Sequence, residues 1–287
     1  MSAPEGRELA YAKINLSLDV LGKREDGYHD LSMVMATVDL ADILTFVHEG
    51  VGLRVESQVS FLPTDRTNLA AAAALAFQKA TGCKVEPLTI QMDKHIPVCA
   101  GTAGGSSDAA AVLRYLDRVM ETRLSLEELQ AIGATVGSDV PYCIIGGTAL
   151  AEGRGERLTP LPPLPTCAVV LCKPNFPVST PALFSQLDRC KIRRRPDTSG
   201  ILAALEAGDL QGVARRLYNV FEDVLQPRQK RTVEAIKNTL VNQGALGAAM
   251  TGTGPTVFGL FENEETAQSA YQTLAEDYPQ TFLCHIV

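Results

Sequence analysis

The chain has 287 residues, of which 46% are hydrophobic and 21% charged, and its net charge at pH 7 is -7. This balance is typical of globular proteins and argues against disorder, while the length allows two domain-sized cores. The acidic charge excludes the basic footprint of a nucleic-acid-binding protein. No apolar run is long enough to span a bilayer and the first residues lack a signal-peptide core, so we expect a cytoplasmic protein without a membrane partner.

Cysteine and histidine usage narrows the chemistry further. The seven cysteines include no C-x-x-C pair, and several lie in apolar segments. This usage is typical of buried thiols in a reducing compartment. None of the four histidines has the spacing of metal ligands, so we predict no metal site built by the protein.

The first expected element is a strand over residues 9–21. Apolar and polar residues alternate along it, which predicts a half-buried strand with Lys13 and Asn15 on its polar face. A turn over residues 22–29 follows, and residues 31–46 are expected to return as strand. Taken alone, Lys13 on such a face is an ordinary solvated lysine.

A glycine-rich loop follows the next helix and strand. Asn68 is expected to cap an alanine-rich helix that Gly82 ends, and residues 88–92 alternate as a strand. The loop from Pro97 to Ser107 then leads into a helix, but its glycines match neither a Walker A loop nor G-x-G-x-x-G. Glycines allow close approach of a ligand, and a helix N-terminus attracts anions. We therefore predict a phosphate site, the alternative being a tight strand-to-helix connection.

A rigid turn carries the second candidate for chemistry. A capping box over Ser125–Glu128 predicts a helix that ends near Gly137. The following segment, Gly137 to Pro141, sets Asp139 between apolar stretches, as a general base requires. A nearby lysine would hold this carboxylate ionised, although Asp139 could equally be only a helix cap. Residues 142–150 are expected to form a strand.

A proline-rich segment over residues 159–165 is the expected hinge between two domains. Beyond it we predict a buried strand, a helix with Thr180 as N-cap and Pro181 at its first position, and further helices to about residue 243. The basic run 191–195 is interpreted as a solvated loop that could still lie near an anionic substrate. A second glycine turn over residues 251–255, by itself only a packed turn, precedes the last expected elements, which are strand 256–261, helix 264–277 and strand 281–287. The order of all the expected elements favours an α+β fold in two layers.

Three motifs in this order resemble those of the GHMP kinase superfamily, which includes galactokinase and homoserine, mevalonate and phosphomevalonate kinases. They are Ala12-Lys13-Ile14-Asn15, the loop from Pro97 to Ser107, and the turn from Thr251 to Val257. The resemblance implies an α+β fold of two domains. It assigns residues 1–158 to a ribosomal-S5-domain-2-like α/β domain and residues 159–287 to a ferredoxin-like α+β domain.

The segment from Arg24 to His29, which reads Arg-Glu-Asp-Gly-Tyr-His, narrows the resemblance. It is similar to the members that act on cytidine diphosphate-linked methylerythritol in non-mevalonate isoprenoid synthesis. The resemblance implies transfer of the γ-phosphate of ATP to the 2-hydroxyl of this small molecule, with Mg²⁺ carried by the nucleotide. Asp139 would accept the hydroxyl proton, and Lys13 would orient Asp139 and offset the developing charge. A monomer or weak homodimer is expected.

The resemblance also implies the binding residues. Those for ATP would be Asn68, Lys94, Pro97, Val98, Cys99, Ala100, Gly101, Thr102, Ala103, Gly104, Gly105, Ser106 and Ser107. Those for the cytidine-bearing substrate would be Asn15, Tyr28, His29 and Phe184, the last of these stacking on cytosine.

The loop departs from the family's usual Gly-Leu-Gly-Gly-Gly-Ser-Ser at Thr102 and Ala103. Alanine disfavours positive φ, so either Ala103 has a negative φ or the loop is slightly altered. Two other functions stay open. A GHMP kinase for a different alcohol is disfavoured by the segment 27–29, and a silent nucleotide-binding protein is disfavoured by the presence of both Lys13 and Asp139.

Overall fold

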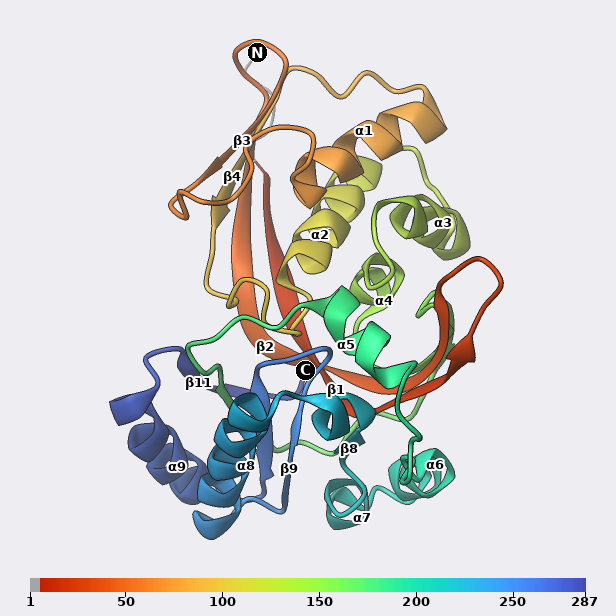
Figure 1. Cartoon of the computed structure of the whole chain (residues 1–287). Helices are drawn as coiled ribbons and strands as arrows, with labels where there is room; N and C mark the ends of the chain where they lie inside the picture. Colours follow the sequence, from red (N-terminus) through yellow and green to blue (C-terminus); the bar gives the residue numbers. More distant parts are fainter. Residues whose placement is uncertain (1–5) are drawn as a thin grey trace. The chain divides into compact units, whose positions relative to one another are not determined.

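The computed structural model describes residues 6–287 (Figure 1). The leading residues, which bear on the expected absence of a signal peptide, lie partly outside this range. The described chain forms two compact units that are not continuous in sequence. The first unit comprises the residues up to Ala12 with 41–98 and 103–146, and the second comprises 13–40, 99–102 and 147–287.

Two long strands explain why the units do not coincide with the predicted ranges 1–158 and 159–287. Strand β1 (Gly6–Lys23) and strand β2 (His29–Val47) each contribute residues to both units. The division of the family domains after residue 158 therefore stays a prediction, separate from the compact units.

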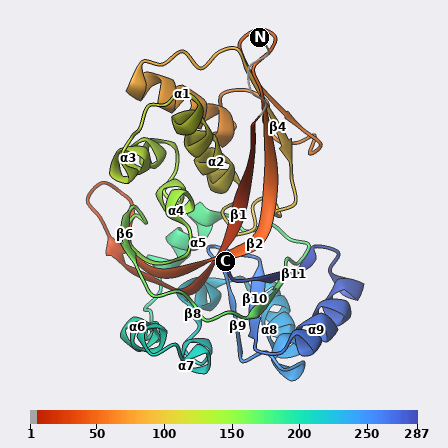
Figure 2. The ribbon, with the colours of Figure 1, turned by 180° about the vertical axis from the view of Figure 1, so that it is seen from behind.

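The first unit combines strands β3 and β4 and parts of β1 and β2 with four helices. Strand β3 (Leu53–Ser57) runs parallel to β4 (Leu88–Asp93), which pairs antiparallel with residues 43–47 of β2. The helices lie together on one side of these strands (Figure 2). They are α1 (Leu69–Thr81), α2 (Gly104–Val119), α3 (Leu126–Val136) and α4 (Val140–Ile145).

Caps read from the sequence set the ends of these helices. The Asn68 Oδ1 atom accepts a hydrogen bond from the Ala70 N–H at 2.9 Å, and Gly82 closes α1 with φ 74°. Ser125 and Glu128 form the predicted capping box at the start of α3. These three predictions are confirmed.

The predicted strand over residues 142–150 is wrong in its first half. Residues 140–145 form α4, because Pro141 occupies the first turn of a helix, where its fixed φ is favourable. Gly146 and Gly147 then adopt φ values of 65° and 67°, which ends the helix before β5 (Thr148–Gly153) begins.

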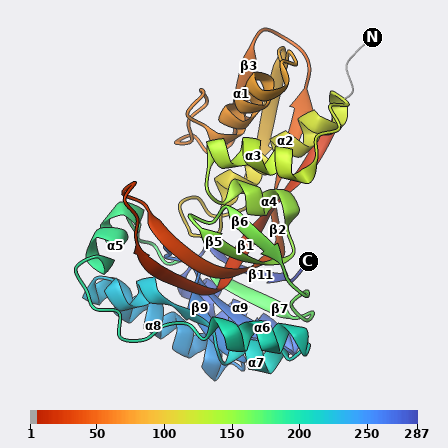
Figure 3. The same cartoon turned by 90° about the vertical axis from the view of Figure 1, so that its right-hand side faces the viewer.

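The second unit contains a four-stranded antiparallel sheet in the order β11-β7-β10-β9. Its strands are β7 (Ala168–Cys172), β9 (Gly247–Met250), β10 (Val257–Phe261) and β11 (Thr281–His285). Helices α8 (Pro227–Asn242) and α9 (Glu264–Asp277) lie along this sheet (Figure 3). Every residue of β7 and β10 is buried, so these strands form the centre of this core.

The remaining strands of the second unit pair with those parts of β1 and β2 that belong to it. Residues 31–36 of β2 pair with β5, which pairs with β6 (Arg157–Pro160). Residues 17 and 18 of β1 run parallel to the two-residue strand β8 (Tyr218–Asn219). The remaining elements are α5 (Thr180–Leu187), α6 (Thr198–Glu206), α7 (Leu210–Ala214) and a 3₁₀ helix (Val220–Val224).

Two further expectations need correction in this unit. The predicted half-buried strand is buried on both faces from Lys13 to Val20, because other segments of the unit cover its polar face. The N-cap of α5 is Ser179, one residue before the predicted Thr180, and its hydroxyl accepts from the Ala182 N–H. Within residues 6–287, no helix has the length and apolar character needed to span a membrane.

Candidate active site

Lys13 is not the solvated lysine that its sequence pattern allowed. The residue is only 3% exposed. Its ammonium donates to Asn15 Oδ1 at 2.6 Å and to the carbonyl oxygen of Gly101 at 3.0 Å. A buried ammonium is costly without such acceptors, so its position is fixed by the groups that satisfy it. These contacts join the first motif to the glycine loop.

Asn15 connects Lys13 to the second glycine turn. Besides the Lys13 ammonium, its Oδ1 atom accepts from the Gly252 N–H at 2.9 Å and from the Thr251 hydroxyl at 3.2 Å. The Asn15 N–H donates back to Thr251 Oγ1 at 3.0 Å. Asn15 was predicted to hold substrate, but its amide oxygen has three donors within the protein. All three motifs therefore meet through hydrogen bonds in the second unit.

Asn219 holds the same turn from the other side and was missed in the sequence. Its Nδ2 atom donates to the carbonyl oxygens of Met250 and Gly252 at 2.7 and 2.8 Å, and its Oδ1 atom accepts from the Phe221 N–H. Asn219 lies in the two-residue strand β8, within a stretch whose pattern suggested only helix, so no sequence signal marked it.

Gly101 and Gly252 bring the two glycine motifs into backbone contact. Their φ values are 80° and 58°, in the region that favours glycine. A Cβ atom on Gly101 would lie 2.2 Å from the Thr251 carbonyl oxygen, and one on Gly252 would lie 2.7 Å from the Gly101 carbonyl oxygen. Neither position therefore has room for a side chain.

The N-terminus of α2 suits an anion. Its first intrahelical bond runs from the Ser107 N–H to the Ala103 carbonyl, so the N–H groups of Gly104, Gly105 and Ser106 precede it. No side chain caps this end. The helix dipole adds positive potential there, and these groups together suit a polyphosphate.

Ala103 resolves the question that the sequence left open. It adopts φ 60° and ψ 24°, so a negative φ at this position is wrong and the loop keeps a left-handed residue. Its neighbour Thr102 is buried, and its carbonyl accepts the Lys13 N–H at 3.2 Å. The Ser107 hydroxyl donates to the Tyr11 carbonyl at 2.6 Å, which ties the start of α2 to β1.

Asp139 stands at the N-cap position of α4, but its carboxylate does not cap the helix. The geometry therefore does not support the interpretation of Asp139 as only a cap. A Cβ atom on Gly137 would lie 3.7 Å from Ser106 Oγ, so this turn lies beside the start of α2. Asp139 and the helical end of the loop belong to the first unit, whereas Lys13 and residues 99–102 belong to the second.

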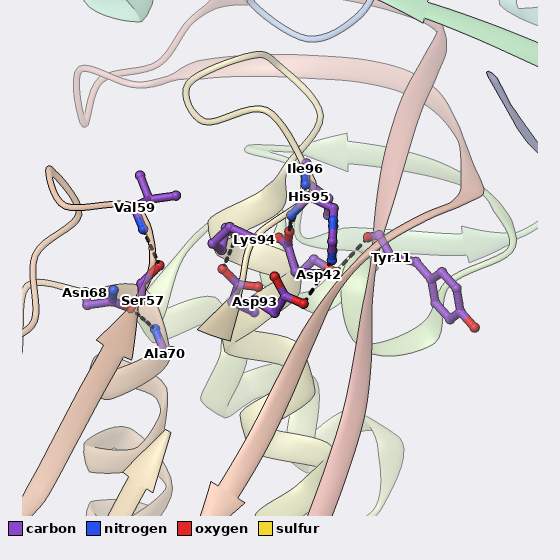
Figure 4. A network of polar contacts seen from close by, with 12 residues as sticks. Tyr11, Asp42, Ser57, Val59, Asn68, Ala70, Asp93, Lys94, His95 and Ile96 are labelled. Carbon is purple, nitrogen blue, oxygen red and sulfur yellow. Dashed lines mark hydrogen bonds and ion pairs between the residues drawn. The ribbon is translucent and has the colours of Figure 1, made fainter. Parts of the chain in front are cut away.

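Asn68 and Lys94, predicted near the nucleotide, already have partners in the first unit. Both amide atoms of Asn68 are hydrogen bonded, to Ala70 and to the carbonyl of Pro63. The Lys94 ammonium contacts Asp42 (Figure 4). It also lies 2.5 Å from Asp108 Oδ2. Burial raises the pKa of Asp108 to about 7, with Lys94 acting against this shift and Asp42 adding to it.

The residues predicted to hold cytidine lie in the second unit. The rings of His29 and Phe184 are stacked, with centroids 4.6 Å apart. His29 Nε2 lies 2.6 Å from Asp188 Oδ1, and Lys23 donates to the other oxygen of Asp188 at 3.0 Å. Hydrogen bonds with His29 and Lys23 lower the pKa of Asp188. Tyr28 is exposed, and the Arg154 guanidinium carbon lies over one face of its ring, 3.6 Å from the centroid.

The basic residues of the run 191–195 are all exposed, as expected of a solvated loop, and two of its arginines also contact neighbouring strands. The Arg195 guanidinium donates to Asp19 Oδ1 at 2.7 Å on β1. The Arg194 guanidinium lies over the Tyr218 ring, 4.6 Å from its centroid. The loop therefore packs near the C-terminal end of β1.

Residues 6–287 contain no group of three or more His, Cys, Asp or Glu side chains placed to bind a metal ion.

Comparison with protein families places this chain in a known class. The model of the GHMP kinase N-terminal domain matches residues 68–147, and that of the GHMP kinase C-terminal domain matches residues 201–280. The chain belongs to the GHMP kinase family.

Its relatives carry a more particular name, 4-diphosphocytidyl-2-C-methyl-D-erythritol kinase. The protein of that name from Alkaliphilus metalliredigens is 43% identical over 95% of this chain and 93% of its own length. The one from Clostridium perfringens is 45% identical over 94% of this chain and 93% of its own.

One solved structure carries the same name, and a second one shares the fold. A crystal structure of 4-(cytidine 5'-diphospho)-2C-methyl-D-erythritol kinase has a TM-score of 0.81 at 32% identity and covers 98% of this chain and 99% of its own. Homoserine kinase from Cytophaga hutchinsonii has a TM-score of 0.74 at 18% identity, covers 99% of this chain and 94% of its own, and shares the fold. The expected α+β class with two GHMP domains is confirmed.

Proposed function

We propose that this protein is an ATP-dependent kinase that phosphorylates the 2-hydroxyl of 4-diphosphocytidyl-2-C-methyl-D-erythritol. The names of its relatives support the acceptor and the reaction. The observation that carries the proposal is the buried Lys13, whose ammonium is held by Asn15 and by the carbonyl of the phosphate loop. Such a cation, fixed beside a polyphosphate loop, suits phosphoryl transfer, where positioning and electrostatics supply most of the catalysis.

In this proposal Asp139 accepts the proton of the acceptor hydroxyl as the phosphate is transferred. Lys13 orients Asp139 and offsets negative charge as it develops. The N–H groups at the start of α2 bind the phosphates of ATP. As in the family it resembles, Mg²⁺ would be carried by the nucleotide, where it would neutralise phosphate charge.

The acceptor is assigned to the side of the site formed by His29, Phe184 and Tyr28. The stacked rings of His29 and Phe184 lie beside the exposed Tyr28, one face of whose ring is occupied by Arg154, and together they offer aromatic surface to a base. Stacking of a base on such a ring contributes about 1–3 kcal/mol in single-strand complexes. We further propose a cytoplasmic enzyme of non-mevalonate isoprenoid synthesis, active as a monomer or weak homodimer.

A coupled assay tests this function directly. The protein is given ATP with the cytidine diphosphate acceptor, and in parallel with homoserine and with mevalonate. We expect ADP release only with the first acceptor. Turnover of homoserine or mevalonate instead would favour a GHMP kinase for another alcohol, and ATP binding without any turnover would favour a silent nucleotide-binding protein.

A further inference from the structure

No sequence motif marks Asp42, yet its side chain contacts the residues directly before the phosphate loop. It is fully buried on β2. Its Oδ1 atom accepts from the N–H groups of His95 and Ile96 at 2.6 and 2.8 Å, and its Oδ2 atom contacts the Lys94 ammonium (Figure 4). Asp42 thus holds the backbone immediately before the loop begins.

The end of the loop is held by the same charges. Asp108 lies in the first turns of α2, and its Oδ2 atom is 2.5 Å from the Lys94 ammonium. A Cβ atom on Gly104 would lie 3.0 Å from the Ile96 side chain and 3.6 Å from Asp42 Oδ2. Ile96, just before the loop, and Gly104, where α2 begins, therefore lie close together. Both lie beside one buried ion triad, which is formed by Asp42, Lys94 and Asp108.

Burying the three charges of the triad costs desolvation free energy, which points to a role other than stability. Two carboxylates share one ammonium, and all three side chains are at most 4% exposed. Buried ion pairs are often no more stabilising than apolar residues of similar volume, and in some proteins they are retained because they fix one arrangement. Asp108 Oδ1 has no hydrogen-bond partner, so the triad is arranged around Lys94 and not for full satisfaction of each oxygen.

We propose that Asp42, Lys94 and Asp108 form a clamp that closes the phosphate loop, and that all three are positioning residues for the nucleotide. Lys94 acts by joining Asp42 to Asp108, and its ammonium does not touch the nucleotide. This role replaces the contact near adenine that the resemblance implied for Lys94. It rests on the proposed function in one respect, because the nucleotide is taken to be ATP.

A double-mutant cycle with two probes tests the clamp. Lys94→Met, Asp108→Asn and the double variant are compared for binding of a non-hydrolysable ATP analogue and of inorganic triphosphate, with the exposed Lys79→Met as the matched control. Each single variant should weaken both probes by about tenfold or more, since small displacements of binding groups are costly. The double variant should bind each probe no more weakly than the single variant with the larger loss of affinity, because either change opens the same clamp. In turnover assays KM for ATP should rise more than kcat falls.

Three outcomes would overturn the clamp. These are additive losses in the double variant, a loss confined to the ATP analogue, which indicates a direct contact with the adenosine part, and unchanged binding. If Lys94→Met does not fold, Asp42→Asn/Lys94→Met/Asp108→Asn carries no buried charge and must show the same loss. Because the two binding measurements need no acceptor, they test the clamp separately from the acceptor assignment.

Discussion

Asp139 is the residue on which the proposed reaction depends most directly. Asp139→Asn keeps the size of the side chain but cannot accept a proton. General base catalysis contributes about 10²–10⁴-fold, so kcat should fall by that factor while the affinity for an ATP analogue changes by less than about twofold. Steady-state kinetics and calorimetric titration measure the two quantities. Turnover close to the wild-type rate would mean that Asp139 is not the base.

Thr251 is predicted to act on catalysis through Lys13. Thr251→Val removes the hydroxyl that accepts the Asn15 N–H and donates to Asn15 Oδ1. A buried N–H left without a partner costs about 1–3 kcal/mol, and the orientation of Lys13 becomes less well defined. We expect a lower free energy of unfolding in urea and a lower kcat, both largely restored in Thr251→Ser. Loss of stability with unchanged kcat would separate this turn from Lys13.

Asp108 should make the stability of the protein depend on pH. Burial raises its pKa in the folded state to about 7, above the value in the unfolded chain. The folded state therefore holds this proton more tightly, and its stabilising effect is lost as the pH rises through about 7. Relative to Asp108→Asn, the wild type should be more stable at pH 5 than at pH 8 in urea unfolding. A pH-independent difference, or one of opposite sign, would contradict the prediction.

At this scale the sequence predicted the residue types of the site better than their surroundings. Lys13, Asp139 and the loop could be found because motifs of adjacent residues carry them. Asp42 and Asn219 could not, because each acts on backbone groups far away in the chain. The burial of Lys13 was likewise hidden, since it depends on segments more than 80 residues away that cover β1.

Among the elements, α2 begins in a way that local rules disfavour. Ala103 is left-handed, which costs about 1–2 kcal/mol for a residue with a Cβ, whereas glycine has no such cost but loses more entropy on folding. Ala103→Gly should therefore stabilise the protein by up to about 1 kcal/mol. Ala109→Gly, inside the same helix, should destabilise it by about 1 kcal/mol or more. Thermal and urea unfolding compare the pair, and destabilisation by Ala103→Gly would mean that the alanine methyl group makes a necessary contact.

Long elements with clear periodicity or caps could be predicted, as α1, α3 and α9 show. Short ones could not. Strands β8 and β9 have two and four residues, too few for alternation to appear, and are defined by their neighbours. The apolar run in α4 fits a buried strand or a buried helix by its pattern, and its six-residue length even favours a strand. Only Pro141, which suits the first turn of a helix, indicates the helix.

For the whole molecule, the order of segments along the chain matters more than the count of domains. The second unit takes residues 13–40 and 99–102 from the earlier half of the chain. A fragment of residues 147–287 would leave β5 without its partner in β2 and β8 without its partner in β1. We expect this fragment alone to lack a cooperative unfolding transition, and co-expression with residues 1–146 to restore it. A cooperatively folded fragment would contradict this expectation.

The contact between Gly101 and Gly252 also limits how the protein can change. Most damaging substitutions in a core can be rescued when a neighbouring side chain becomes smaller. Here the obstacle to a side chain at either position is a carbonyl group of the main chain, which every amino acid carries. No second substitution can therefore compensate for the first. In a library of suppressors, these two positions should yield only reversion to glycine.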